Sequence, residues 1–202
     1  QTCALPISRD RSGNPQCAPD LYMDSGRLLR LLQDEQPQLF VGAVTNPYKY
    51  TVADSWLQHL KMLRKLNSGS QFIVTEAGWD MKKLQELQWF MASRGLSEPV
   101  VARLRFVEAK SIMPLMDHEQ PGLVMPSALA ARLERDMSTD ERHARLAQIS
   151  RLALQAVGCR LLGYSGVQIG GIADMELAPL LLRRIQDSLK EFTTYEIGRA
   201  HV

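Results

Sequence analysis

Three basic residues, Lys61, Arg64 and Lys65, lie three and four residues apart in a segment with helical periodicity. This spacing places their side chains close together on one helix. A fixed guanidinium with two ammonium groups suits a dianionic ligand such as a pyrophosphate. The alternative is a solvated basic helix end, which the helix dipole also favours. On the residue types alone, the solvated helix end is favoured.

Polar side chains also follow the apolar segments of the chain. The apolar segments cover residues 39–45, 71–75, 99–104 and 166–169. Their ends carry Asn46, Thr75 with Glu76, Arg103 with Arg105, and Gln168 with Gly170 and Gly171. If the segments are parallel strands, these groups gather at one rim, where a ligand can bind. Polar caps without a ligand explain the pattern equally well.

The composition excludes several classes of protein. A net charge of +2, with 23% charged residues, argues against a nucleic-acid or membrane-surface patch. No apolar run reaches the roughly 18 residues of a membrane span. His59, His118 and His143 have no metal-ligand spacing, so no metal site is predicted. Widely spaced cysteines define no disulfide framework, and a reduced, cytoplasmic compartment is expected.

Helical segments alternate with the apolar ones. We predict a helix capped by Thr51, with Asp54 in a capping-box position, and a second helix capped by Asp80 and ended by Gly95. Further along we predict a helix over 109–118, an extended stretch over 123–125, a helix over 127–135, a longer helix between Thr139 and Gly158, and a helix over 173–190. The Asp24-Ser25 pair opens another helix.

Repeated strand–helix units predict an α/β fold with parallel strands and right-handed crossovers. The choice lies between an open doubly wound sheet and a closed eight-fold barrel. No Gly-rich phosphate loop is present, which argues against dinucleotide-binding and P-loop folds. A full barrel needs about 250 residues, so this chain could hold only part of one.

The two ends of the chain are related through DNA. Residues 196–202 can be encoded by GAG ATC GGA AGA GCA CAC GTC, and the reverse complement, read one base out of frame, encodes residues 2–8. The string also looks like a sequencing adapter. We therefore expect residues 1–8 and 196–202 to be translated adapter and not native. Residues 9–195 would then be a fragment of a longer protein.

Four segments carry a resemblance to a known family. They are Phe40-Val-Gly-Ala-Val-Thr-Asn-Pro47, Leu63-Arg-Lys-Leu-Asn-Ser-Gly-Ser-Gln-Phe-Ile-Val-Thr-Glu76, Pro121-Gly-Leu-Val-Met-Pro126 and Gly163-Tyr-Ser-Gly-Val-Gln-Ile-Gly-Gly171. In order and spacing they resemble the methylenetetrahydrofolate reductase family, whose second motif reads K-R-K-x-x-A-G-A-x-F-x-x-T-Q. The resemblance covers roughly residues 20–190. It implies a partial (β/α)8 TIM barrel, comprising strands five to eight with their helices.

The resemblance also implies an activity. Family members pass a hydride from NAD(P)H through a flavin, usually FAD and alternatively FMN, to 5,10-methylenetetrahydrofolate, giving 5-methyltetrahydrofolate. Arg64 and Lys65 match the basic pair that contacts the FAD phosphate and ribose, and Lys61 could share that role. Asp24 and Ser25 fall where the family has further flavin contacts, although simple N-capping is the alternative. Asn46, at a strand end, is a further cofactor-binding candidate.

The substrate residues show departures from the family. Glu76 stands where the family usually has the glutamine that hydrogen-bonds the pterin, and Gln168 is the second substrate-binding candidate. An ionised carboxylate only accepts hydrogen bonds, whereas glutamine also donates them. Arg103 or Arg105 could neutralise Glu76, and a purely structural Glu–Arg pair is the alternative. Lys110 stands near a position where relatives have an aromatic that stacks on the folate.

Other candidate residues lie at or beyond the ends of the native segment. The acidic residue near the flavin would fall close to Asp10, and the main catalytic acid lies outside the chain. The expected function is therefore that of the parent reductase, with the fragment itself inactive.

Two other functions stay open. One is a non-catalytic or regulatory paralogue that binds a folate or pterin, or a corrinoid or methyltransferase partner. The other is a pterin-binding barrel without flavin. The sequence also leaves a homo-oligomer open as an alternative to a methyltransferase partner.

Overall fold

A computed structural model describes residues 23–108, 111–116 and 123–199, with side chains described as far as residue 192. Four strands form one parallel sheet: β1 (Gly42–Thr45), β2 (Phe72–Gly78), β3 (Val100–Arg105) and β4 (Gly166–Gly170). Neighbours in the sheet follow chain order, β1-β2-β3-β4, so β1 and β4 are its two edges. Parallel strands in chain order confirm the α/β prediction and are compatible with part of a barrel.

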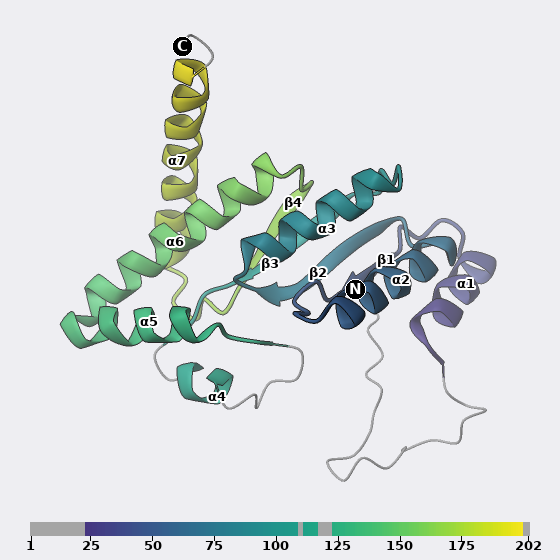
Figure 1. Ribbon diagram of the computed structural model, residues 1–202, viewed down its shortest axis with the longest axis horizontal. Coiled ribbons are helices and arrows are strands. Elements are labelled where there is room, and N and C mark those ends of the chain that lie inside the picture. The colour runs from purple at the N-terminus through teal and green to yellow at the C-terminus, as the bar shows by residue number, and fades with distance from the viewer. Residues whose placement is uncertain (1–22, 109–110, 117–122, 200–202) are drawn as a thin grey trace.

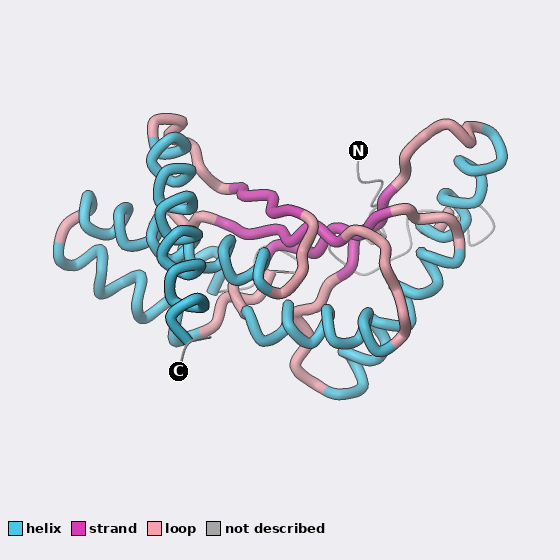
Figure 2. The backbone as a smooth tube through the Cα atoms, turned by 90° about the horizontal axis from the view of Figure 1, so that it is seen from above, coloured by secondary structure: helices cyan, strands magenta, loops and turns pink. Residues whose placement is uncertain are grey.

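The helices lie along one side of this sheet. They are α1 (Ser25–Glu35), α2 (Val52–Asn67), α3 (Met81–Ser93), α4 (Ile112–Met116), α5 (Ser127–Thr139), α6 (Glu141–Leu161) and α7 (Leu177–Arg199). Figure 1 shows their order along the chain, and α7 extends away from the remaining elements. Figure 2 shows helices along one side of the sheet and around its ends, whereas none of the described helices covers the other side. We call this uncovered side the bare face.

The main core lies between the sheet and the helices. Side chains that point away from the bare face, such as Ile73, Ala102 and Leu104, are fully buried against the helices. Leu84 and Leu87 of α3 and Ala153 of α6 supply the opposing surface. A second, smaller cluster comprises Trp79, Val107, Ile112, Leu115, Met125, Ala130 and Leu133. Because successive strand residues alternate between faces, every second residue of each strand is left for the bare face.

Helix capping follows the sequence prediction at two of three sites. The Thr51 hydroxyl accepts a hydrogen bond from the Asp54 N–H, and Asp80 caps α3 in the same manner. The third prediction, that Thr139 caps the long helix, is wrong. Asp140 is the cap, because its backbone is extended and its carboxylate accepts the His143 N–H at 3.1 Å.

The long helix also ends later than predicted. Gly158 does not stop α6, which continues to Leu161, and Gly163 (φ 88°) follows it in the left-handed region. Gly158 instead leaves room for the Met81 methyl group. A Cβ atom added at Gly158 would lie only 2.9 Å from this methyl group. Residues 123–125 form no strand, and only Ile112–Met116 of the predicted 109–118 helix lies among described helical residues.

The described residues offer neither a membrane span nor a metal-binding cluster. None of the described helices is long and apolar enough to cross a membrane. The described part of the chain also holds no group of three His, Cys, Asp or Glu side chains placed to bind a metal ion.

Candidate functional site

A cavity of about 350 Å³ lies between α1, β1 and α2. Ligand pockets in proteins typically have volumes of roughly 300–1,000 Å³, so this cavity is large enough for part of a cofactor. It is lined by five of the six residues predicted to bind the cofactor: Asp24, Ser25, Lys61, Arg64 and Lys65. Residues from two helices, far apart in sequence, therefore lie around one cavity. We call this site the α1–α2 cavity.

The basic wall of the cavity comes from one side of α2. Lys61, Arg64 and Lys65 are three or four residues apart, and Gln58 and Ser68 continue the same row in both directions. Sequence reasoning missed Gln58, although extending the helical spacing by one turn towards the N-terminus would have found it. The basic residues lie in the last turns of α2, where the helix dipole stabilises positive charge. Three cations on one wall favour an anionic ligand.

Lys65 is held in place on this wall. Its Nζ donates a hydrogen bond of 2.6 Å to the carbonyl oxygen of Val44. The Val41 carbonyl accepts a hydrogen bond from the Gln71 N–H, just before β2. Because successive carbonyls of a strand point to opposite sides, the Val44 carbonyl points away from β2. Burial, reinforced by repulsion from Lys61, lowers the pKa of Lys65 below its ordinary value, while Glu76 counteracts this. The Lys65 ammonium group therefore binds the Val44 carbonyl and is partly shielded from water.

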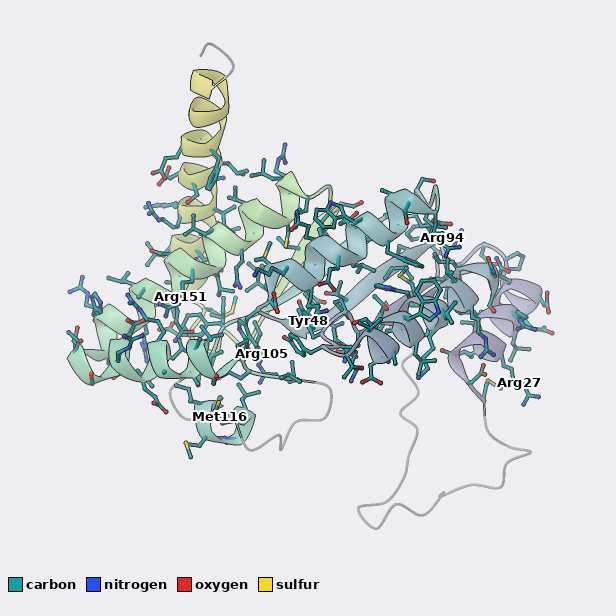
Figure 3. The ribbon with its side chains drawn as sticks, in the orientation of Figure 1. Arg27, Tyr48, Arg94, Arg105, Met116 and Arg151 are labelled. Carbon is teal, nitrogen blue, oxygen red and sulfur yellow. The ribbon has the colours of Figure 1, made fainter. Side chains whose placement is uncertain are left out.

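The opposite wall of the cavity is the beginning of α1. The Asp24 carboxylate accepts the Arg27 N–H at 2.8 Å, so Asp24 is the N-cap of this helix. Ser25 is the first helical residue and also lines the cavity. Arg27, labelled in Figure 3, marks this end of the molecule. The capping role proposed as the alternative for Asp24 is thus real, and it coexists with a position on the cavity wall.

Asn46 does not line the α1–α2 cavity. Its side-chain oxygen accepts the N–H of Tyr48 at 3.0 Å, which shapes the turn after β1. Tyr48, labelled in Figure 3, is buried in the main core. The structure therefore places Asn46 at the end of β1, apart from the other five predicted residues, and cofactor binding by Asn46 stays a prediction.

The two predicted substrate residues lie on the bare face, joined by Arg103. Arg103 Nη1 is 3.6 Å from Glu76 Oε2, and Arg103 Nε donates to Gln168 Oε1 at 3.0 Å. Three neighbouring strands thus contribute one polar row. Of the two arginines considered as partners for Glu76, Arg103 forms the ion pair. Arg105 lines a separate cavity of about 30 Å³ beside Trp79 and Arg151.

An irregularity in β2 lies beside Glu76. The register between β2 and β3 shifts between Val74 and Ala77, so β2 carries an extra residue there. The Thr75 hydroxyl accepts the Arg103 N–H at 2.9 Å, where a main-chain carbonyl would otherwise act. Bulges of this kind redirect side chains and are frequent beside binding sites.

Two other candidates cannot be placed. Lys110 and Asp10 lie outside the described residues.

Comparison with known proteins gives one informative similarity. Neither a family model nor a curated protein matches the chain. Among solved structures, the chain is similar to an uncharacterised protein from Clostridium thermocellum that binds two copies of 5-methyl-5,6,7,8-tetrahydrofolic acid. The TM-score is 0.57 at 16% sequence identity, which indicates a shared fold. The match covers 86% of this chain but 61% of the other, so the chain spans less than two thirds of that protein.

Proposed function

We propose that this chain belongs to a flavin-dependent methylenetetrahydrofolate reductase, in which it supplies strands five to eight of a (β/α)8 barrel. The observation that carries this proposal is the meeting of Asp24, Ser25, Lys61, Arg64 and Lys65 in one cavity. The family resemblance assigns all five of these residues to the cofactor, and the basic types and spacing of Lys61, Arg64 and Lys65 suit an anionic ligand. Their convergence from two helices is what a shared ligand would require.

The residues present fit a flavin dinucleotide. Arg64 and Lys61 are exposed and cationic, and Lys65 is fixed beside them, so the cavity can neutralise a pyrophosphate. When bound, the flavin supplies hydride transfer between NAD(P)H and the folate. The protein residues bind and orient the cofactor, and Lys65 stays held by the Val44 carbonyl. FMN, which lacks the pyrophosphate, would use fewer of these contacts.

The bare face is the proposed folate site. The similar Clostridium thermocellum protein binds 5-methyltetrahydrofolate, which supports reduced folate as the ligand class for this fold. Glu76 has a partly exposed carboxylate, which can accept hydrogen bonds from the aminopyrimidine edge of a pterin. Arg103 and Gln168 complete the polar row beside it.

A second candidate function is favoured by the Glu76–Arg103 pair. The family resemblance implies glutamine at position 76, whereas this chain has a glutamate bound to an arginine. That change motivates a paralogue that binds a folate or pterin without catalysing its reduction. Its binding face would be the same, but the α1–α2 cavity would not hold a flavin.

Spectroscopy of the full-length protein separates the two functions. The reductase should purify with a bound flavin, which absorbs visible light, and should oxidise NAD(P)H only when methylenetetrahydrofolate is present. A colourless protein that binds reduced folate, and takes up neither FAD nor FMN on addition, would support the non-catalytic paralogue. A protein that binds neither flavin nor folate would contradict both functions.

A further inference from the structure

The Glu76–Arg103 pair is not a strong stabilising interaction. The Glu76 and Arg103 side chains are 37% and 26% exposed, and the closest oxygen–nitrogen distance is 3.6 Å. Exposed ion pairs of this kind typically contribute little to folding stability. Folding stability therefore does not explain why Arg103 of β3 stands between Glu76 of β2 and Gln168 of β4.

The geometry restrains Arg103 from both sides. Its backbone N–H is bonded to the Thr75 hydroxyl, and its Nε atom is bonded to Gln168 on β4. Its Nη1 atom lies towards Glu76 on β2. Gln168 thus orients the guanidinium, and the guanidinium in turn orients the Glu76 carboxylate.

We propose that Arg103 is a specificity-determining residue of the folate site, because its guanidinium, oriented by Gln168, attracts the Glu76 carboxylate and favours one position for it as an acceptor on the bare face. This proposal rests on the proposed folate function. A fixed carboxylate accepts two hydrogen bonds and donates none, so it selects a ligand edge with two adjacent N–H donors. The 2-amino group and N3–H of a 2-amino-4-oxopyrimidine form such an edge. Without Arg103, the Glu76 carboxylate would lose its cationic neighbour on β3, and this selection would weaken.

A comparison of two ligands tests this role in the full-length protein. The first probe is 5-methyltetrahydrofolate, and the second is its analogue without the 2-amino group. Their affinities are measured by calorimetry for the wild type, Arg103→Gln and Arg103→Lys. Arg184→Gln is the matched control, because Arg184 also has a glutamate neighbour, Glu191 at 3.9 Å, but lies on α7.

The ratio of the two affinities is the decisive quantity. The wild type should prefer the 2-amino ligand by about tenfold or more, since a hydrogen bond to a charged group is lost in the analogue. Arg103→Gln should reduce this preference several-fold, Arg103→Lys should restore part of it, and Arg184→Gln should leave it unchanged. A structural role would weaken both ligands equally, so an unchanged ratio in Arg103→Gln would overturn the proposal.

A further variant covers the case in which Arg103→Gln does not fold. Gln168→Ala removes the group that orients Arg103 without altering either charge, and the Gln168 side chain is exposed. The proposal predicts a smaller preference in this variant, and an unchanged preference contradicts it. Failure of the wild type to bind 5-methyltetrahydrofolate would instead contradict the folate function itself.

Discussion

The Nζ atom of Lys65 lies 2.6 Å from the carbonyl oxygen of Val44, so a lysine of α2 is hydrogen-bonded to the backbone of β1. The same lysine lines the α1–α2 cavity beside Arg64. One interaction therefore joins α2 to β1 and holds one cation of the cavity wall in place.

The first prediction concerns the cofactor. Arg64→Ala in the full-length protein should weaken flavin binding by about tenfold or more, because it removes a charge-assisted contact worth roughly 1.5–3 kcal/mol. Flavin retained after dialysis, measured by absorbance, is the readout. Arg184→Ala removes an exposed arginine elsewhere and should have no effect. Equal flavin retention in the Arg64 and Arg184 variants would contradict the assignment.

The second prediction concerns pH. The His59 ring stacks on Phe90 with ring centroids 4.2 Å apart, and burial lowers the pKa of His59 below its ordinary 6.5. The unfolded chain therefore binds a proton more readily, so the free energy of unfolding should fall as pH drops from 6.5 to the lower folded pKa. Thermal melts of His59→Gln should show a weaker pH dependence in this window. Parallel pH profiles for variant and wild type would refute it.

The third prediction concerns thiol reactivity. Cys159 is fully buried in the main core, and burial raises the pKa of its thiol to about 12. Since the thiolate is the reactive form, alkylation at mildly alkaline pH should be very slow in the native protein. Peptide mass spectrometry should find Cys159 labelled by iodoacetamide only after denaturation. Rapid labelling under native conditions would show that the α6 region opens readily.

The fourth prediction concerns the 202-residue chain expressed alone. The β4 edge and the bare face are uncovered, and Val167 and Gln168 of β4 are exposed. Unpaired strand edges promote association between chains. The isolated chain should therefore aggregate or remain loosely packed, and it should lack reductase activity. A stable monomer whose strand amides resist hydrogen exchange would contradict this expectation.

Much of the fold was predictable because local signals were strong. Apolar runs bounded by glycine, proline and asparagine predicted all four strands, and side-chain caps at Thr51 and Asp80 predicted two helix starts. The cap of α6 was misplaced by one residue, because Thr139 and Asp140 are adjacent and both residue types cap helices. The tertiary role of Gly158 against Met81 left no local signal.

The site was predictable only in part. Helical spacing identified the basic residues of α2, but their meeting with α1 required the folded chain. The choice of Arg103 over Arg105 as partner of Glu76 depended on how β2 pairs with β3, including the register shift beside Glu76. Register shifts arise from pairing between strands distant in sequence, so alternation along a single strand does not reveal them.

The most direct test is a calorimetric titration of the full-length protein with 5-methyltetrahydrofolate, alongside Glu76→Ala. We predict saturable binding by the wild type and an affinity at least about tenfold lower for the variant, because Glu76 supplies a charged hydrogen-bond acceptor. Flavin content should be equal in the two proteins, since Glu76 does not line the α1–α2 cavity. Absence of saturable binding by the wild type, or equal affinity in the variant, would contradict a folate site on the bare face.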